Sequence, residues 1–83
     1  NLAIWGAGGK GSSFLNLIDP EQIFVKCVVD INPRKQGKFI GGTGHPIVNY
    51  IDLDKFNVDT ILIMNPNYLS EIEKLTTKKL ILI

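Results

Sequence analysis

Glycines near the start of the chain have the spacing of a phosphate-binding turn. Gly6, Gly8 and Gly11 form a G-x-G-x-x-G pattern directly after the apolar run Leu2–Trp5. Gly6 permits a tight turn, Gly8 lets the backbone approach a phosphate, and Gly11 allows a helix to pack closely on a strand. The N-terminus of that helix offers unpaired N–H groups and a partial positive charge to an anion. The pattern therefore predicts an anion-binding site at this turn.

The two residues between Gly8 and Gly11 belong to the same predicted ligand-binding turn. They are Gly9 and Lys10. The ammonium group of Lys10 either adds a positive charge toward a phosphate or points to water, and both interpretations remain open. A P-loop is excluded, because Lys10 is followed by Gly11 rather than by Ser or Thr.

An acidic residue stands where a ribose-binding group is expected. Asp30 closes the second apolar run, residues 24–29, about 20 residues beyond the glycine turn. Its carboxylate can accept hydrogen bonds from both hydroxyls of a ribose. Alternatively, Asp30 caps the local turn that contains Asn32, as Asp and Asn often do. We predict both residues to be ligand-binding, with the capping role as the open alternative.

Three later residues complete the predicted ligand-binding set. The glycine-rich loop 37–46 contains Thr43 and His45, and its N–H groups either wrap a phosphate or only connect two elements. His45 is the only histidine. No carboxylate or serine has a sequence spacing from it that indicates a catalytic dyad, so no catalytic residue is predicted. Asn65 follows another apolar run and either binds a base or sugar or caps the next helix.

The elements that would position these residues alternate between strands and helices. Apolar runs predict buried parallel strands at residues 2–5, 24–29, 60–64 and 79–83, and a shorter run predicts one at 46–49. Helices are predicted at 9–18, 50–57 and 67–76. Their expected inward side chains are Phe14, Leu15 and Ile18 in the first, Ile51 and Phe56 in the second, and Tyr68, Leu69, Ile72 and Leu75 in the third.

This alternation predicts an α/β fold, namely a Rossmann-like three-layer domain with a parallel sheet of four to five strands in the order 3-2-1-4-5. Ligands of such sheets bind beyond the carboxyl ends of the strands, at the point where the strand order reverses. The glycine turn, residues 30–34 and residues 64–66 are expected to converge there.

Composition limits the classes of function. The 83 residues make a single domain, 1–83, and we expect it to be a fragment of a longer polypeptide. The net charge of +1 gives no bulk attraction to nucleic acid or membrane, and no apolar run approaches the ~20 residues of a membrane span. The single cysteine, Cys27, forms no disulfide framework or metal-ligand pattern. We expect it to be a buried, inert thiol in a cytoplasmic protein.

Several segments together resemble the C-terminal domain of S-adenosylmethionine-dependent C-methyltransferases that act on nucleotide-linked sugars. The opening run from Ile4 to Gly11 resembles the W-G-A-G-x-K-G motif of that family. The other segments that carry the resemblance are residues 28–38, 42–47 and 61–66. The run V-D-x-N-P-x-K-Q-G within residues 29–37 is the most specific of them, because a generic Rossmann domain has no reason to hold it.

The resemblance implies a substrate-side role. In that family S-adenosylmethionine binds to a preceding domain, so this chain is expected to bind no cofactor and to have that domain and a nucleotide-linked sugar as partners. The turn 6–11, Asp30 and the loop 41–46 are then expected to help shape the sugar-nucleotide site. The family's catalytic residues lie largely upstream, and none is assigned to this chain.

Two alternatives remain open at the level of sequence. The chain can be a free-standing NAD-, CoA- or nucleotide-binding module of another enzyme, since D-x-N-P-x-K-x-G sequences are also similar to CoA-binding and sugar acyltransferase N-terminal domains. It can also be a degenerate domain in which the glycines serve only the turn.

Overall fold

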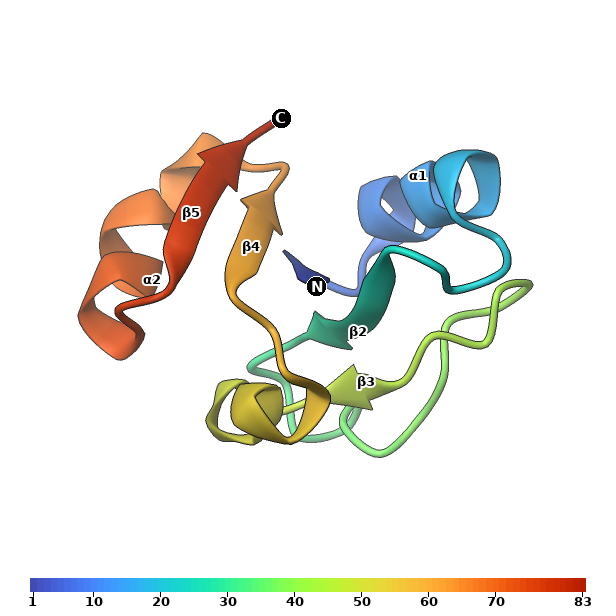
Figure 1. Ribbon diagram of the computed structural model, residues 1–83, viewed down its shortest axis with the longest axis horizontal. Helices are drawn as coiled ribbons and strands as arrows, with labels where there is room; N and C mark the ends of the chain where they lie inside the picture. The colour runs from blue at the N-terminus through green and yellow to red at the C-terminus, as the bar shows by residue number, and fades with distance from the viewer.

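Five parallel strands form one sheet in the order β3-β2-β1-β4-β5 (Figure 1). The computed structural model describes residues 1–83. The strands are β1 (Leu2–Trp5), β2 (Val25–Val29), β3 (Ile47–Val48), β4 (Thr60–Ile63) and β5 (Lys79–Leu82). Both the predicted α/β class and the predicted strand order are confirmed. The apolar runs were informative because a parallel strand covered on both faces needs apolar side chains in both directions.

Helices cover the sheet on both faces. Helix α1 (Gly9–Ile18) packs on one face, where Leu15 contacts a cluster that includes Ile4 of β1. The 3₁₀ helix η1 (Tyr50–Phe56) and helix α2 (Leu69–Leu75) pack on the other face, in a cluster that includes Ala3 and Trp5 of the same strand. Successive residues of β1 therefore face opposite layers, as the pleat of a strand requires. The predicted three-layer arrangement is confirmed.

The inward face of η1 differs from the prediction. A 3₁₀ helix has three residues per turn, so residues three apart share a face. Tyr50, Leu53 and Phe56 accordingly pack together on the core. The expectation for Phe56 is confirmed, whereas the one for Ile51 is wrong, because its side chain is 69% exposed.

Several other side chains predicted to be buried are exposed, among them Phe24, which lies just before β2 and is 63% exposed. Ile18 lies on the outer side of α1, and Tyr68 lies in the short 3₁₀ helix η2 (Pro66–Tyr68), before the regular turns of α2 begin. The strand at residues 79–83 was predicted to be buried, yet Ile81, Leu82 and Ile83 are exposed. The reason is that β5 is an edge strand that pairs only with β4.

A buried carboxylate fastens the end of α1 to the start of β2. Asp19 is 3% exposed, and its two oxygens accept hydrogen bonds from the backbone N–H groups of Ile23 at 2.9 Å, Phe24 at 3.1 Å and Val25 at 2.7 Å. Burial by itself would raise the pKa of Asp19. The backbone hydrogen bonds from Val25, Ile23 and Phe24 outweigh burial and hold the pKa below its ordinary value.

Cys27 lies in the centre of β2 and is fully buried, as expected. Burial, with a smaller contribution from the charge of Asp52, raises the pKa of the thiol to about 12. We therefore expect iodoacetamide at about pH 8, close to the ordinary thiol pKa of about 8.5, to leave the folded protein unmodified. Mass spectrometry should find complete modification after denaturation in guanidinium chloride. Rapid alkylation of the folded protein would contradict this burial.

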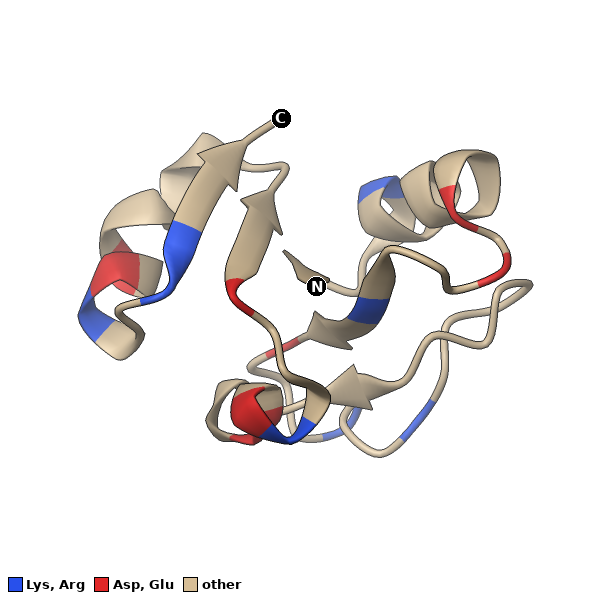
Figure 2. Cartoon of the chain, viewed as in Figure 1, with Lys and Arg blue, Asp and Glu red and all other residues tan.

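The charged residues are spread over helices, strands and loops rather than gathered on one element (Figure 2). None of the helices combines the length and the apolar character that a membrane crossing requires. No group of three or more His, Cys, Asp or Glu side chains is arranged to hold a metal ion.

Candidate functional site

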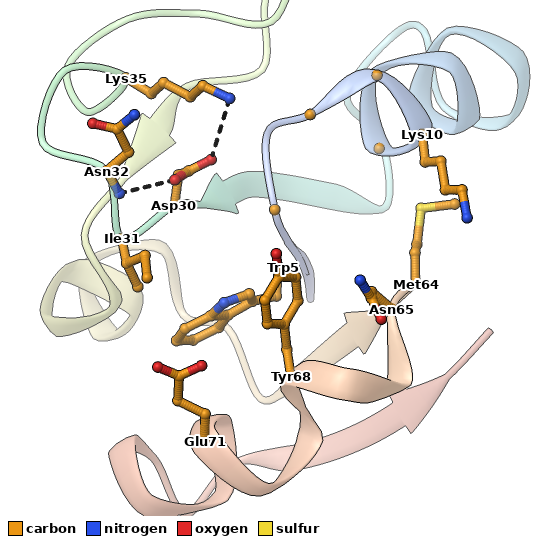
Figure 3. A pocket seen from close by; sticks show the side chains of 14 residues that line it. Trp5, Lys10, Asp30, Ile31, Asn32, Lys35, Met64, Asn65, Tyr68 and Glu71 are labelled. Atoms are coloured by element: carbon orange, nitrogen blue, oxygen red, sulfur yellow. Dashed lines mark hydrogen bonds and ion pairs between the residues drawn. The ribbon is translucent and has the colours of Figure 1, made fainter.

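A cavity of about 370 Å³ opens at the carboxyl ends of the central strands. We call it the strand-end cavity. At its carboxyl end β1 is aligned with both neighbours, so that Trp5 pairs with Val29 of β2 and with Ile63 of β4. The three segments that follow these strands consequently meet at one edge of the sheet. The residues that line the cavity are Trp5, Gly6, Gly8, Gly9, Lys10, Gly11, Asp30, Ile31, Asn32, Lys35, Met64, Asn65, Tyr68 and Glu71 (Figure 3).

Two glycines of the turn are required by the protein itself. Gly6 has φ +106°, which side-chain-bearing residues rarely adopt. At Gly11 an added Cβ would lie 2.6 Å from the backbone oxygen of Gly6, which is much shorter than a normal contact. The close approach of α1 to the end of β1 therefore depends on the absence of a side chain at Gly11.

Two other glycines of the turn have no such structural reason. Gly8 has φ −75° and ψ −175°, an extended conformation open to any residue. An added Cβ at Gly8 or Gly9 would meet no protein atom within 4 Å. Both glycines are exposed on the cavity wall. Glycine at these positions keeps space free inside the cavity rather than in the core.

The N-terminus of α1 is open toward this space. No side chain caps it, and its first turn contains no acidic residue. The first N–H groups of a helix have no partner within the helix, and they carry a partial positive charge. A negatively charged group can therefore bind at this end of α1 without displacing a side chain.

Asp30 ties the glycine turn to the loop after β2. One carboxylate oxygen accepts a hydrogen bond from Ala7 N at 3.0 Å, and the other accepts from Asn32 N at 2.9 Å. The ammonium group of Lys35 lies 4.0 Å from Oδ2 of Asp30. Asn32 caps the same turn, since its side-chain oxygen accepts from Arg34 N at 3.0 Å. The capping role of both residues is thus confirmed, and each oxygen of Asp30 keeps one lone pair for a ligand.

Lys10 and Asn65 lie together on another side of the cavity, next to Met64 (Figure 3). The side-chain oxygen of Asn65 accepts a hydrogen bond from Asn67 N at 3.0 Å and so caps η2. The predicted capping role of Asn65 is confirmed. Its amide nitrogen remains as a donor on the cavity side.

The structure does not bring Thr43 and His45 to the cavity. The loop 41–46 directly precedes β3, so it lies at the amino edge of a parallel sheet, opposite the strand-end cavity. It rests against the connection between α1 and β2 (Figure 1), where the Gln22 side chain donates to Thr43 O at 2.9 Å. The expectation that this loop shapes the same site is therefore wrong for this cavity.

His45 has a structural role in the loop. Its side chain is fully buried, with Nδ1 2.6 Å from Thr43 Oγ1 and Nε2 3.5 Å from Asp19 Oδ2. Nε2 therefore faces the carboxylate of Asp19 without a hydrogen bond between them. This arrangement joins the glycine-rich loop to the end of α1 and leaves no access for a ligand.

Residues 1–80 match the model of a protein family described as the C-methyltransferase C-terminal domain. The chain belongs to this family. The match covers almost the whole chain, as the resemblance of the sequence segments did. The comparison with curated proteins gave no match.

In this C-methyltransferase C-terminal domain, sequence reasoning missed several residues of the cavity. Trp5 belongs to a core cluster and Glu71 is exposed to solvent, but neither of them, nor Tyr68, was assigned to a ligand site from the sequence. All three line the cavity. The signal for Tyr68 and Glu71 was their place shortly after β4, because segments that follow the carboxyl ends of strands border the crevice.

Proposed function

We propose that the strand-end cavity binds a nucleotide-linked sugar and holds it for a methyl-donor domain of the same protein. In this proposal S-adenosylmethionine binds to that other domain, and the present domain supplies no catalytic residue. The domain positions the substrate, and the attacking and leaving groups belong to the substrate and the methyl donor.

The observation that carries the proposal is the pair of glycines, Gly8 and Gly9, that no protein contact requires. They stand at the open N-terminus of α1 on the wall of a cavity of about 370 Å³. Small-molecule sites have volumes of about 300–1,000 Å³. A side chain at Gly8 would fill the space nearest the unpaired N–H groups, so its absence suits a ligand that approaches the backbone closely.

Charge supports an anionic group in this part of the ligand. Lys10 lies in the first turn of α1, and both Lys10 and Lys35 line the cavity. Lys10 and the N-terminus of α1 favour a phosphate or diphosphate, whereas the charge of Lys35 is partly offset by Asp30 at 4.0 Å. The single buried cysteine agrees with a cytoplasmic location, which we include in the proposal.

The alternative of an NAD-binding module receives less support from Asp30. A dinucleotide site uses this acid for the ribose hydroxyls, whereas both oxygens of Asp30 already accept backbone hydrogen bonds. A sugar or ribose hydroxyl can use only the remaining lone pairs. Asp30 therefore acts first as a positioning residue for the glycine turn.

Replacing Gly8 by valine is expected to weaken binding of thymidine diphosphate at least tenfold with only a small loss of melting temperature, because valine is a poorer N-cap residue than glycine. The backbone at Gly8 suits any residue, and the new side chain would enter only open space in the cavity. Isothermal titration calorimetry measures the affinity, and thermal unfolding measures the stability. The matched control is Gly41→Val, because an added Cβ at Gly41 also meets nothing within 4 Å and Gly41 lies in the loop away from the cavity.

A panel of ligands separates the alternatives. Binding of thymidine diphosphate, with none of NAD, CoA or S-adenosylmethionine, supports the proposed function. A tighter response to NAD or CoA would replace it with the nucleotide-module alternative. If no nucleotide binds, the glycines serve only the turn and the domain is structural.

A further inference from the structure

The indole ring of Trp5 forms part of the cavity wall and carries a polar group without a partner. Its side chain is 7% exposed and stacks on Tyr50, with ring centroids 6.3 Å apart. The Nε1–H donates no hydrogen bond within the protein. Nε2 of His45 is the only fully buried polar side-chain atom without a hydrogen-bond partner. Nε1 of Trp5, which also has no partner, is therefore not fully buried. A largely buried indole N–H normally finds an acceptor, so this donor is left for a group in the cavity.

Apolar side chains surround this donor. Tyr68 is 43% exposed and Ile31 is 57% exposed, and both line the cavity beside Trp5 (Figure 3). Tyr68 comes from η2 and Ile31 from the loop after β2. Two aromatic rings, an aliphatic side chain and one N–H donor suit a flat heteroaromatic ring with an acceptor atom on its edge.

The charged side chains differ in sign between the two ends of the cavity. Glu71 lies at the same end as Trp5 and Tyr68, whereas Lys10 lies beside Met64 and Asn65 (Figure 3). A phosphate at the Trp5 end would face the carboxylate of Glu71, while a phosphate near Lys10 would face a cation and the N-terminus of α1. An elongated anionic ligand therefore has one favourable orientation.

We infer that the Trp5–Tyr68 end of the strand-end cavity is a subsite for the base of the nucleotide. The base lies against Tyr68 and accepts a hydrogen bond from Nε1 of Trp5, and the diphosphate extends toward the N-terminus of α1. This inference rests on the proposed function, because it assigns parts of the same ligand to parts of the same cavity. Trp5 and Tyr68 then determine which ligands bind, and the glycine turn holds the group that nucleotides share.

The fluorescence of Trp5 tests the inference directly, because Trp5 is the only tryptophan of the chain. Titration with thymidine diphosphate is expected to change its emission, whereas pyrophosphate, which has no base, is expected to leave it unchanged. Trp5→Phe keeps an aromatic ring and removes the N–H donor. Calorimetry with this variant is expected to show about fivefold to tenfold weaker binding of thymidine diphosphate and unchanged binding of pyrophosphate.

Tyr68→Ala provides a second variant at an exposed position, where the fold does not depend on the side chain. We expect about tenfold weaker binding of thymidine diphosphate from the loss of stacking. Phe39→Ala is the matched control, since Phe39 is an exposed aromatic outside the cavity. If Trp5→Phe and Tyr68→Ala bind as tightly as wild type while Gly8→Val does not bind, the base subsite is wrong and the proposed function stands. If the wild type binds no nucleotide, both are overturned.

Discussion

The Asp19→Ala variant is expected to lose roughly 4 kcal/mol of unfolding free energy. Three backbone N–H groups would lose their acceptor, that of Val25 in a buried position and those of Ile23 and Phe24 in partly buried ones. Each unsatisfied buried donor costs about 1–3 kcal/mol. Domains of this length have total stabilities of only about 4–12 kcal/mol, so the variant is expected to be close to unfolded at room temperature. Urea denaturation followed by circular dichroism measures the loss.

Asp19→Asn keeps one oxygen acceptor but removes the charge, so we expect an intermediate loss of about 2 kcal/mol that remains measurable if the alanine variant does not fold. The control is Glu21→Ala in the same connection, because Glu21 is exposed and makes no hydrogen bond or ion pair. Its effect should stay within about 0.5 kcal/mol. Equal effects of Asp19→Ala and Glu21→Ala would show that the carboxylate does not fasten α1 to β2.

The Asp19 carboxylate should also make the stability of the protein depend on pH. The folded-state pKa of Asp19 is held below its ordinary value, since backbone hydrogen bonds favour the charged form. A lowered folded pKa stabilises the protein above the unfolded pKa of about 3.9, and this stabilisation is lost as the pH falls through the folded value. Urea midpoints should therefore fall more steeply with acid below about pH 4 in the wild type than in Asp19→Asn.

The sequence predicts the strands and their order better than it predicts which side chains of the helices and of the edge strand are buried. Strand order follows from the alternation of apolar runs and helices, which leaves few topologies. Which side chains of a helix are buried depends on the number of residues per turn, and helix propensity does not distinguish a 3₁₀ helix from an α-helix. Residues 50–56 form a 3₁₀ helix, so Leu53 points inward in place of Ile51. The exposure of β5 depends on its edge position, and an apolar run alone does not distinguish an edge strand from a central one.

The candidate site was also predicted only in part. The convergence of the glycine turn with Asp30 and Asn65 follows from the rule that ligands bind beyond the carboxyl ends of parallel strands. The same rule, applied to direction, would have excluded Thr43 and His45, because a loop that leads into a parallel strand lies at the opposite edge. Asp19 was not predicted to be important. No local pattern reveals that its carboxylate is surrounded by three backbone donors.

Replacing Gly11 by alanine is expected to lower the unfolding free energy by about 1–3 kcal/mol, because the new Cβ would lie 2.6 Å from the backbone oxygen of Gly6. Two rigid backbones meet at this contact, so α1 would have to move away from β1. The clash outweighs the gain in helix propensity from Gly to Ala, which is at most about 1 kcal/mol.

Gly9→Ala on the same helix is the matched control with the opposite expected sign. An added Cβ at Gly9 meets nothing within 4 Å, so only the propensity gain remains and the variant should be as stable as wild type or slightly more stable. Urea midpoints of the two variants, measured together, test the distinction between glycines that the fold requires and glycines that the cavity requires. If Gly11→Ala is as stable as Gly9→Ala, the close contact of α1 with the turn is wrong. The argument that Gly8 and Gly9 serve a ligand would then lose its contrast with Gly11.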